Sequence, residues 1–92
     1  MQLDDLELFG KPPLEKWKEI MQNASPTLVG LELERLLEEV ALLELFIESK
    51  GLDCAEVRNY ARSFDEEQKE NLRAMKDSLA IESMGIILGN HE

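Results

Sequence analysis

The stretch that most constrains the fold is residues 25–51, SPTLVGLELERLLEEVALLELFIESKG. Ser25 and Pro26 form a helix start signal. The serine oxygen can accept a hydrogen bond from a first-turn amide, and a proline at the first helical position loses no hydrogen bond. Gly51 is typical of a helix stop, because glycine enters the left-handed backbone region at little cost. The sequence therefore predicts one long helix here.

The apolar residues of this helix predict that it has neighbours on at least two sides. Six of them recur in a 4-3-4-3-4 spacing, which places them on one stripe of a helix. These six are Val29, Leu33, Leu36, Val40, Leu43 and Ile47. Residues 40–47 are apolar on other faces too, with Glu44 as their one polar residue. An apolar side chain left in water forgoes roughly 1.5–3 kcal/mol of burial, so Leu42, Leu45 and Phe46 should also be covered.

Helices are also predicted on both sides of this stretch. A proline pair begins a first helix over residues 13–23. Capping-box spacings at Asp53 and Ser63 predict a third helix ending near Arg62 and a fourth over residues 65–84. One continuous helix stays open as an alternative, since no glycine or proline separates the last two. We expect an all-α fold, a small three- or four-helix bundle around one long central helix.

The chain length predicts a single domain over residues 1–92, with residues 1–11 as a tail. This tail is interpreted either as a frayed terminus or as an acidic, hydrophobic docking segment that orders on a partner. A 25-residue helix is about 38 Å long, whereas a compact chain of this length is about 32 Å across. Either the long helix protrudes from an elongated bundle or a second copy covers the excess. This mismatch motivates the prediction of a homodimer.

The charge is strongly acidic, with ten Lys and Arg residues against twenty Asp and Glu residues. Binding to a nucleic-acid backbone or an anionic membrane needs clustered cations, so we expect neither. The charge is compatible with a partner protein that has a basic surface, and equally with solubility alone. The single cysteine, the acidic N-terminal segment and the lack of a long apolar run predict a cytoplasmic protein without a signal peptide or membrane span.

The sequence predicts no enzyme, cofactor or metal site. Nucleophilic catalysis needs a nucleophile beside an oriented base, whereas Cys54 and His91, the single cysteine and histidine, belong to different segments. Cys54 lies in a predicted first helical turn, where a helix N-terminus can lower the pKa of a thiol, but no histidine or lysine is adjacent in sequence, so we interpret it as a structural or incidental cysteine. Glu67 and Glu70 have the spacing of one metal-binding pair, but no second pair matches them, so we interpret them as a solvated acidic face.

The predicted function is that of a protein–protein interaction module, either an adaptor, a chaperone, or a regulatory or inhibitory subunit, that associates with itself. The alternative is an acidic inhibitor that mimics nucleic acid at a basic enzyme site. Excess apolarity marks six candidate partner-binding residues, Trp17, Leu45, Phe46, Ile86, Ile87 and Leu88. Packing inside the chain stays open as an alternative for Trp17 and for residues 86–88.

Overall fold

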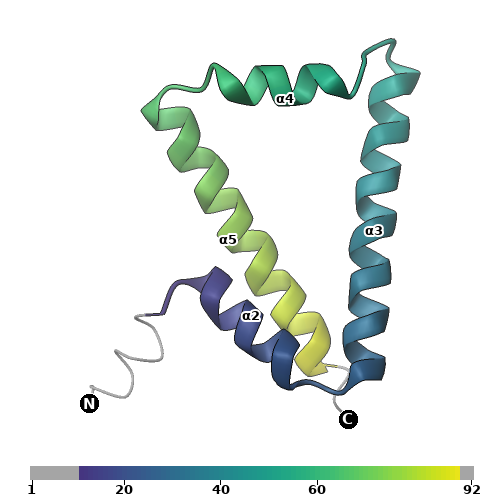
Figure 1. Ribbon diagram of the computed structural model, residues 1–92, viewed down its shortest axis with the longest axis vertical. Helices are drawn as coiled ribbons and strands as arrows, with labels where there is room; N and C mark the ends of the chain where they lie inside the picture. Colours follow the sequence, from purple (N-terminus) through teal and green to yellow (C-terminus); the bar gives the residue numbers. More distant parts are fainter. Residues whose placement is uncertain (1–10, 90–92) are drawn as a thin grey trace.

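The computed structural model describes residues 11–89, which contain four α-helices and no strand (Figure 1). They are α2 (Pro13–Asn23), α3 (Pro26–Ser49), α4 (Ala55–Arg62) and α5 (Glu66–Gly89). The all-α fold class is confirmed. The predictions for residues 1–10 and for His91 lie outside the described residues.

The ends of α3 are those that its sequence predicts. The Ser25 hydroxyl oxygen accepts a hydrogen bond from the Leu28 amide at 3.2 Å, and Pro26 is the first helical residue. After the helix, Gly51 has a φ of 81°, in the left-handed region that disfavours residues with a Cβ. Local signals are sufficient here because each acts within one helical turn.

The break between α4 and α5 is made by a capping box two residues beyond the predicted one. The Asp65 carboxylate accepts a hydrogen bond from the Gln68 amide at 2.8 Å, and the Gln68 side-chain oxygen accepts one from the Asp65 amide at 2.9 Å. The Ser63 hydroxyl instead donates to the Tyr60 carbonyl oxygen, 3.0 Å away. The alternative of one continuous helix is therefore wrong.

α5 continues five residues beyond its predicted end, through Gly85 to Gly89. A glycine inside a helix costs about 1 kcal/mol relative to alanine. Continuing the helix places Ile87 in the core, where 2% of its surface is exposed. Full burial of an isoleucine side chain is worth roughly 1.5–3 kcal/mol, which is enough to offset the glycine.

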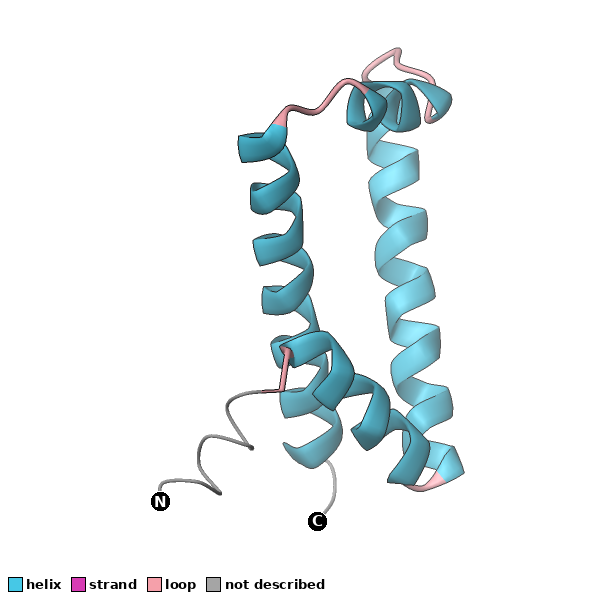
Figure 2. Ribbon diagram, turned by 60° about the vertical axis from the view of Figure 1, so that its left-hand side comes forward, coloured by secondary structure: helices cyan, strands magenta, loops and turns pink. Residues whose placement is uncertain are grey.

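The four helices form an open triangle rather than a filled bundle. Figure 1 shows α3 and α5 as two long sides that converge toward α2 and are joined by α4 at their far ends, and Figure 2 shows α2 reaching from α5 to α3 at their lower ends. α5 packs chiefly against α2 and less extensively against α3. The radius of gyration is 16.3 Å, whereas a compact chain of this length has about 12 Å. Within one chain, the tertiary contacts therefore gather on α5, and α3 keeps most of its surface.

All the buried residues of the described chain lie at one end of the triangle. We call this end the base; it consists of α2, residues 26–37 of α3 and residues 76–89 of α5. Its four buried residues are Glu32, Ala80, Ser83 and Ile87. We call residues 38–75 the open end, and none of them is buried. One chain thus builds a core only at its base.

Candidate interaction surface

Large apolar side chains are exposed on three of the four helices. Sixteen such residues are exposed among those that the structure describes, and half of them belong to α3. The eight on α3 are Leu31, Leu33, Leu37, Val40, Leu42, Leu43, Leu45 and Phe46. Soluble monomers rarely expose contiguous apolar patches larger than a few hundred Å². We therefore take this apolar surface as the candidate functional site.

The second half of α3 is apolar and exposed on several faces at once. The exposed fractions are 55% for Leu42, 63% for Leu45 and 60% for Phe46. The Lys50 ammonium lies 5.1 Å from the centre of the Phe46 ring, close enough for a cation–π contact. The sequence predicts that these three apolar residues are covered, and residues 11–89 leave each of them more than half exposed.

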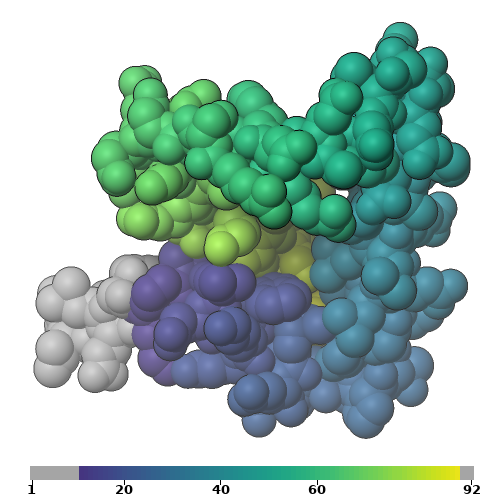
Figure 3. All heavy atoms as spheres, turned by 45° about the horizontal axis from the view of Figure 1, so that its top comes forward, coloured from purple at the N-terminus to yellow at the C-terminus, as the bar shows by residue number. Residues whose placement is uncertain are grey.

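α5 carries a second exposed apolar row, which runs from the open end into the base. Leu72, Met75 and Leu79, which form its predicted inner stripe, are 51%, 60% and 52% exposed. Figure 3 shows the molecule hollowed between α4 and the base, with part of α5 visible at the bottom of the hollow. The apolar stripes of α3 and α5 therefore have the predicted residues, but within a single chain neither stripe packs closely enough against the other to be buried.

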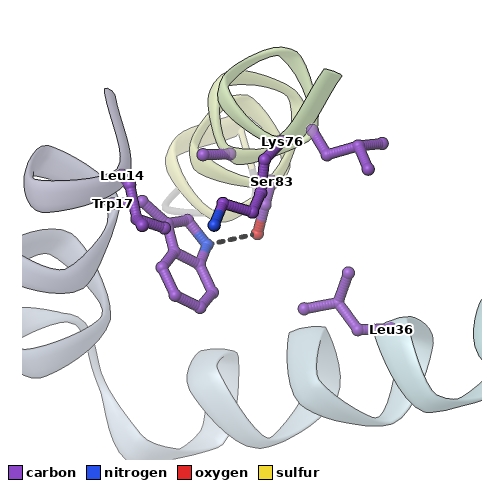
Figure 4. A pocket seen from close by; sticks show the side chains of 7 residues that line it. Leu14, Trp17, Leu36, Lys76 and Ser83 are labelled. Atoms are coloured by element: carbon purple, nitrogen blue, oxygen red, sulfur yellow. Dashed lines mark hydrogen bonds between the residues drawn. The ribbon is translucent and has the colours of Figure 1, made fainter. Parts of the chain in front are cut away.

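An apolar pocket of about 140 Å³ lies where the base meets this hollow. Trp17 enters it from α2 and Leu36 lines it from α3, while Lys76 and Ser83 belong to α5 (Figure 4). The indole N–H of Trp17 donates a hydrogen bond to the Ser83 hydroxyl oxygen at 2.8 Å. Apart from Lys76 and Ser83 the lining residues are apolar, and the Ser83 hydroxyl is already hydrogen-bonded. The pocket therefore suits an apolar side chain better than a polar ligand.

Beside this pocket, four side chains form a polar network whose centre, Ser83 and Glu32, is buried. The Ser83 hydroxyl accepts from Trp17 and donates to the Glu32 carboxylate at 2.5 Å. Arg35 donates two hydrogen bonds to the same carboxylate, from Nε at 2.9 Å and from Nη2 at 2.8 Å. Within residues 11–89, no buried side-chain nitrogen or oxygen lacks a partner.

The network stabilises the charged form of Glu32. The hydrogen bond from Arg35 lowers the pKa of the Glu32 carboxyl below its ordinary value of 4.5, and Ser83 adds to this effect, while burial opposes it. Glu32 in turn raises the pKa of Arg35 above its ordinary value. The Glu32 side chain is 1% exposed and that of Arg35 is 32% exposed, so one partner of this ion pair is buried and the other reaches solvent.

The structure divides the six candidate partner-binding residues between the two ends of the molecule. Leu45 and Phe46 are exposed at the open end. The other four lie at the base, where Trp17 and Ile86 are half-buried, Ile87 is buried and Leu88 is 57% exposed. Ile87 thus belongs to the core of the single chain. That the exposed members bind a partner remains a prediction.

Glu32 and Ser83 are structural residues that the sequence reasoning missed, although the sequence contains a signal for each. Glu32 lies three residues after Val29 and four before Leu36, which places it on the apolar stripe of its helix. Ser83 lies four residues after Leu79 on the apolar stripe of α5. A polar residue on an apolar stripe needs a buried hydrogen-bond partner, and each of these two supplies the other's.

The start of α4 departs from the predicted capping box. The Asp53 carboxylate accepts a hydrogen bond from the Ala55 amide at 3.0 Å, whereas the Glu56 amide bonds to the Asp53 backbone oxygen at 2.9 Å. Cys54 occupies the position before the first helical residue and provides no side-chain cap. The backbone turn therefore satisfies the amide that the predicted side-chain bond would have satisfied.

The helix N-terminus does not lower the pKa of the Cys54 thiol. Burial raises the pKa of the Cys54 thiol, and the carboxylates of Glu44, Glu48 and Asp53 raise it further. These negative charges disfavour the thiolate and outweigh the short helix that follows. The thiol lies 3.8 Å from the Glu44 carbonyl oxygen, its hydrogen-bond acceptor.

Two further features of residues 11–89 bear on chemistry. No three His, Cys, Asp or Glu side chains in this range are grouped as metal ligands would be. Glu70, one of the two acids with metal-pair spacing, forms an ion pair with Arg73 at 2.8 Å. In the same range no helix is long and apolar enough to cross a membrane.

The fold and the surface together define a small all-α protein with a core at one end and a large exposed apolar surface. The chain belongs to the family described as "Domain of unknown function (DUF2018)", whose model matches residues 9–92. A comparison with curated proteins finds no match.

Proposed function

We propose that this protein is a small acidic interaction module that associates with itself, so that a second copy of the chain covers its apolar surface. The observation that carries this proposal is the second half of α3. Leu42, Leu45 and Phe46 share one face of this helix and are all more than half exposed. Val40 and Leu43, on the opposite face, are more than half exposed as well. One additional helix cannot cover both faces, whereas a second chain can contribute several helices.

The free energy at stake supports association. Each of the sixteen exposed side chains is about half exposed, so each forgoes roughly 1 kcal/mol of hydrophobic stabilisation. The total is on the order of 15 kcal/mol, an upper estimate because unfolded chains also bury some apolar surface. A whole domain is typically stable by about 5–15 kcal/mol. The uncovered surface is therefore worth as much as folding itself.

The accessible surface points in the same direction. The chain exposes 7398 Å², whereas a compact chain of its mass exposes about 5,400 Å². The difference, roughly 2,000 Å², exceeds the area of about 800 Å² that each partner contributes to an interface of standard size. This excess is in the range of obligate homodimers, whose interfaces resemble a domain core.

A second copy of the chain fits this apolar surface better than a basic protein that binds through opposite charge. The exposed residues are apolar, and a two-fold pairing brings the same patch of each copy together. Two copies carry equal net charges of −10 and repel each other, so salt should leave the dimer unchanged or strengthen it. Binding driven by a basic partner would instead weaken as salt rises.

The experiment is size-exclusion chromatography with light scattering over a dilution series at low and high salt. We expect a mass of two chains that persists at high salt. A single-chain mass at every concentration would overturn the proposal. A complex with a basic protein that dissociates at high salt would also overturn the proposal. It would favour the alternative function, an acidic inhibitor that mimics nucleic acid at a basic enzyme site.

The dimer would leave the acidic residues of the outer surface free for a further protein. That arrangement suits an adaptor, a chaperone or a regulatory subunit. The single cysteine, which allows no disulfide within the chain, supports a reducing compartment such as the cytoplasm.

A further inference from the structure

Three helices of the base are joined by one continuous chain of hydrogen bonds. It runs from Trp17 on α2 to Ser83 on α5, and from there to Glu32 and Arg35 on α3. Trp17 and Ser83 are 66 residues apart in the sequence, and Ser83 and Glu32 are 51 apart. These hydrogen bonds therefore depend on how the helices pack together and not on the formation of any single helix.

The chemistry of the donors and acceptors permits only one set of directions for these hydrogen bonds. An indole N–H can only donate and an ionised carboxylate can only accept. The Ser83 hydroxyl must therefore accept from Trp17 and donate to Glu32, as it does. Arg35 holds the carboxylate from its other side by two bonds, which fixes the plane of the carboxylate. The direction of each of these hydrogen bonds is therefore fixed.

The apolar contacts around the network are much less directional. Ala80 and Ile87 lie on the same face of α5 as Ser83, three residues before it and four after it. Apolar side chains can slide past one another at small cost, because the hydrophobic effect has no preferred direction. Sliding α5 past α2 or α3 would instead leave buried hydrogen-bonding groups without partners, which is costly.

We propose that the Trp17–Ser83–Glu32–Arg35 network is a conformational lock that fixes the positions of α2, α3 and α5 at the base. Because α3 and α5 converge at the base and separate beyond it (Figure 1), the lock also sets how far apart their apolar rows lie at the open end. Ser83 is its central positioning residue, since it contacts the other two helices at once. This role goes beyond self-association and does not depend on it.

The test is a double-mutant cycle between Trp17 and Ser83. Ser83→Ala removes the hydroxyl, and Trp17→Phe keeps a ring but removes the indole N–H. Unfolding by urea is followed by circular dichroism at one fixed protein concentration for the wild type, both single variants and the double variant. We expect coupling: the combined effect on the unfolding constant is about tenfold smaller than the product of the separate effects. Ser78→Ala is the matched control, because Ser78 is exposed on the same helix.

A second measurement separates a lock from simple loss of stability. Because the Trp17 indole N–H is bonded to Ser83, we expect it to exchange with solvent more slowly than a free indole. We expect this exchange to quicken in Ser83→Ala and in Glu32→Gln, but not in the exposed control Glu34→Gln. This comparison also holds if the double variant does not fold.

Two results would overturn the proposal. One is independent effects of the Trp17 and Ser83 substitutions, with Ser83→Ala behaving as Ser78→Ala does. The other is an indole exchange rate that none of the network substitutions changes.

Discussion

The most informative perturbation replaces Leu45 and Phe46 together with glutamine. These side chains are 63% and 60% exposed in one chain, so their loss removes little packing within it. Glutamine is a good helix former, and α3 should therefore persist. In a dimer the two substitutions affect four side chains. If a second copy covers the exposed fraction, each loses about 1–2 kcal/mol.

The total for four side chains is at least about 4 kcal/mol, which corresponds to a roughly thousandfold weaker dimer. Sedimentation over a dilution series measures the dissociation constant, and circular dichroism checks the helix content. Glu38→Gln is the matched control, because it changes an exposed residue of the same helix without removing apolar surface. A double variant that dimerises as tightly as the wild type would refute the reasoning.

Three further predictions follow from single contacts. The pKa of Glu32 is held below 4.5 in the fold, so its contribution to stability is complete above the unfolded pKa and is lost as the pH falls through the folded value. Urea midpoints measured from about pH 6 to pH 3 should therefore fall less steeply in Glu32→Gln than in the wild type. Because the pKa of the Cys54 thiol is raised, iodoacetamide at neutral pH should modify the folded protein more slowly than the urea-unfolded chain. Asp65→Ala removes the carboxylate that accepts from Gln68, and chemical denaturation should show a loss of about 1 kcal/mol, whereas equal midpoints would exclude a capping role.

Much of the local structure was predictable because its causes are local. Ser25 and Gly51 define the ends of α3 through contacts and backbone angles within one turn. The break before α5 was also predicted, but its residues were not. Ser63 and Asp65 each begin a capping-box spacing, with Glu66 and Gln68 three residues further on, and the structure forms the box of Asp65 and Gln68.

The candidate surface was predictable in part. The exposure of Leu45 and Phe46 follows from a helix that is apolar on more faces than one small chain covers. The division of residues 86–88 did not follow from the sequence, because three consecutive aliphatic residues on a helix point in three directions. Packing against α2 and α3 decides which of them is buried, and Ile87 is that residue.

The sequence by itself determined the helices, the ends of α3 and the excess of apolar surface, since these depend on neighbours along the chain. Only the tertiary structure decided that the core forms at one end and that Glu32 and Ser83 lie within it. Their pairing joins residues 51 positions apart, and such a contact depends on how helices pack in space. No spacing within a single helix can therefore specify it.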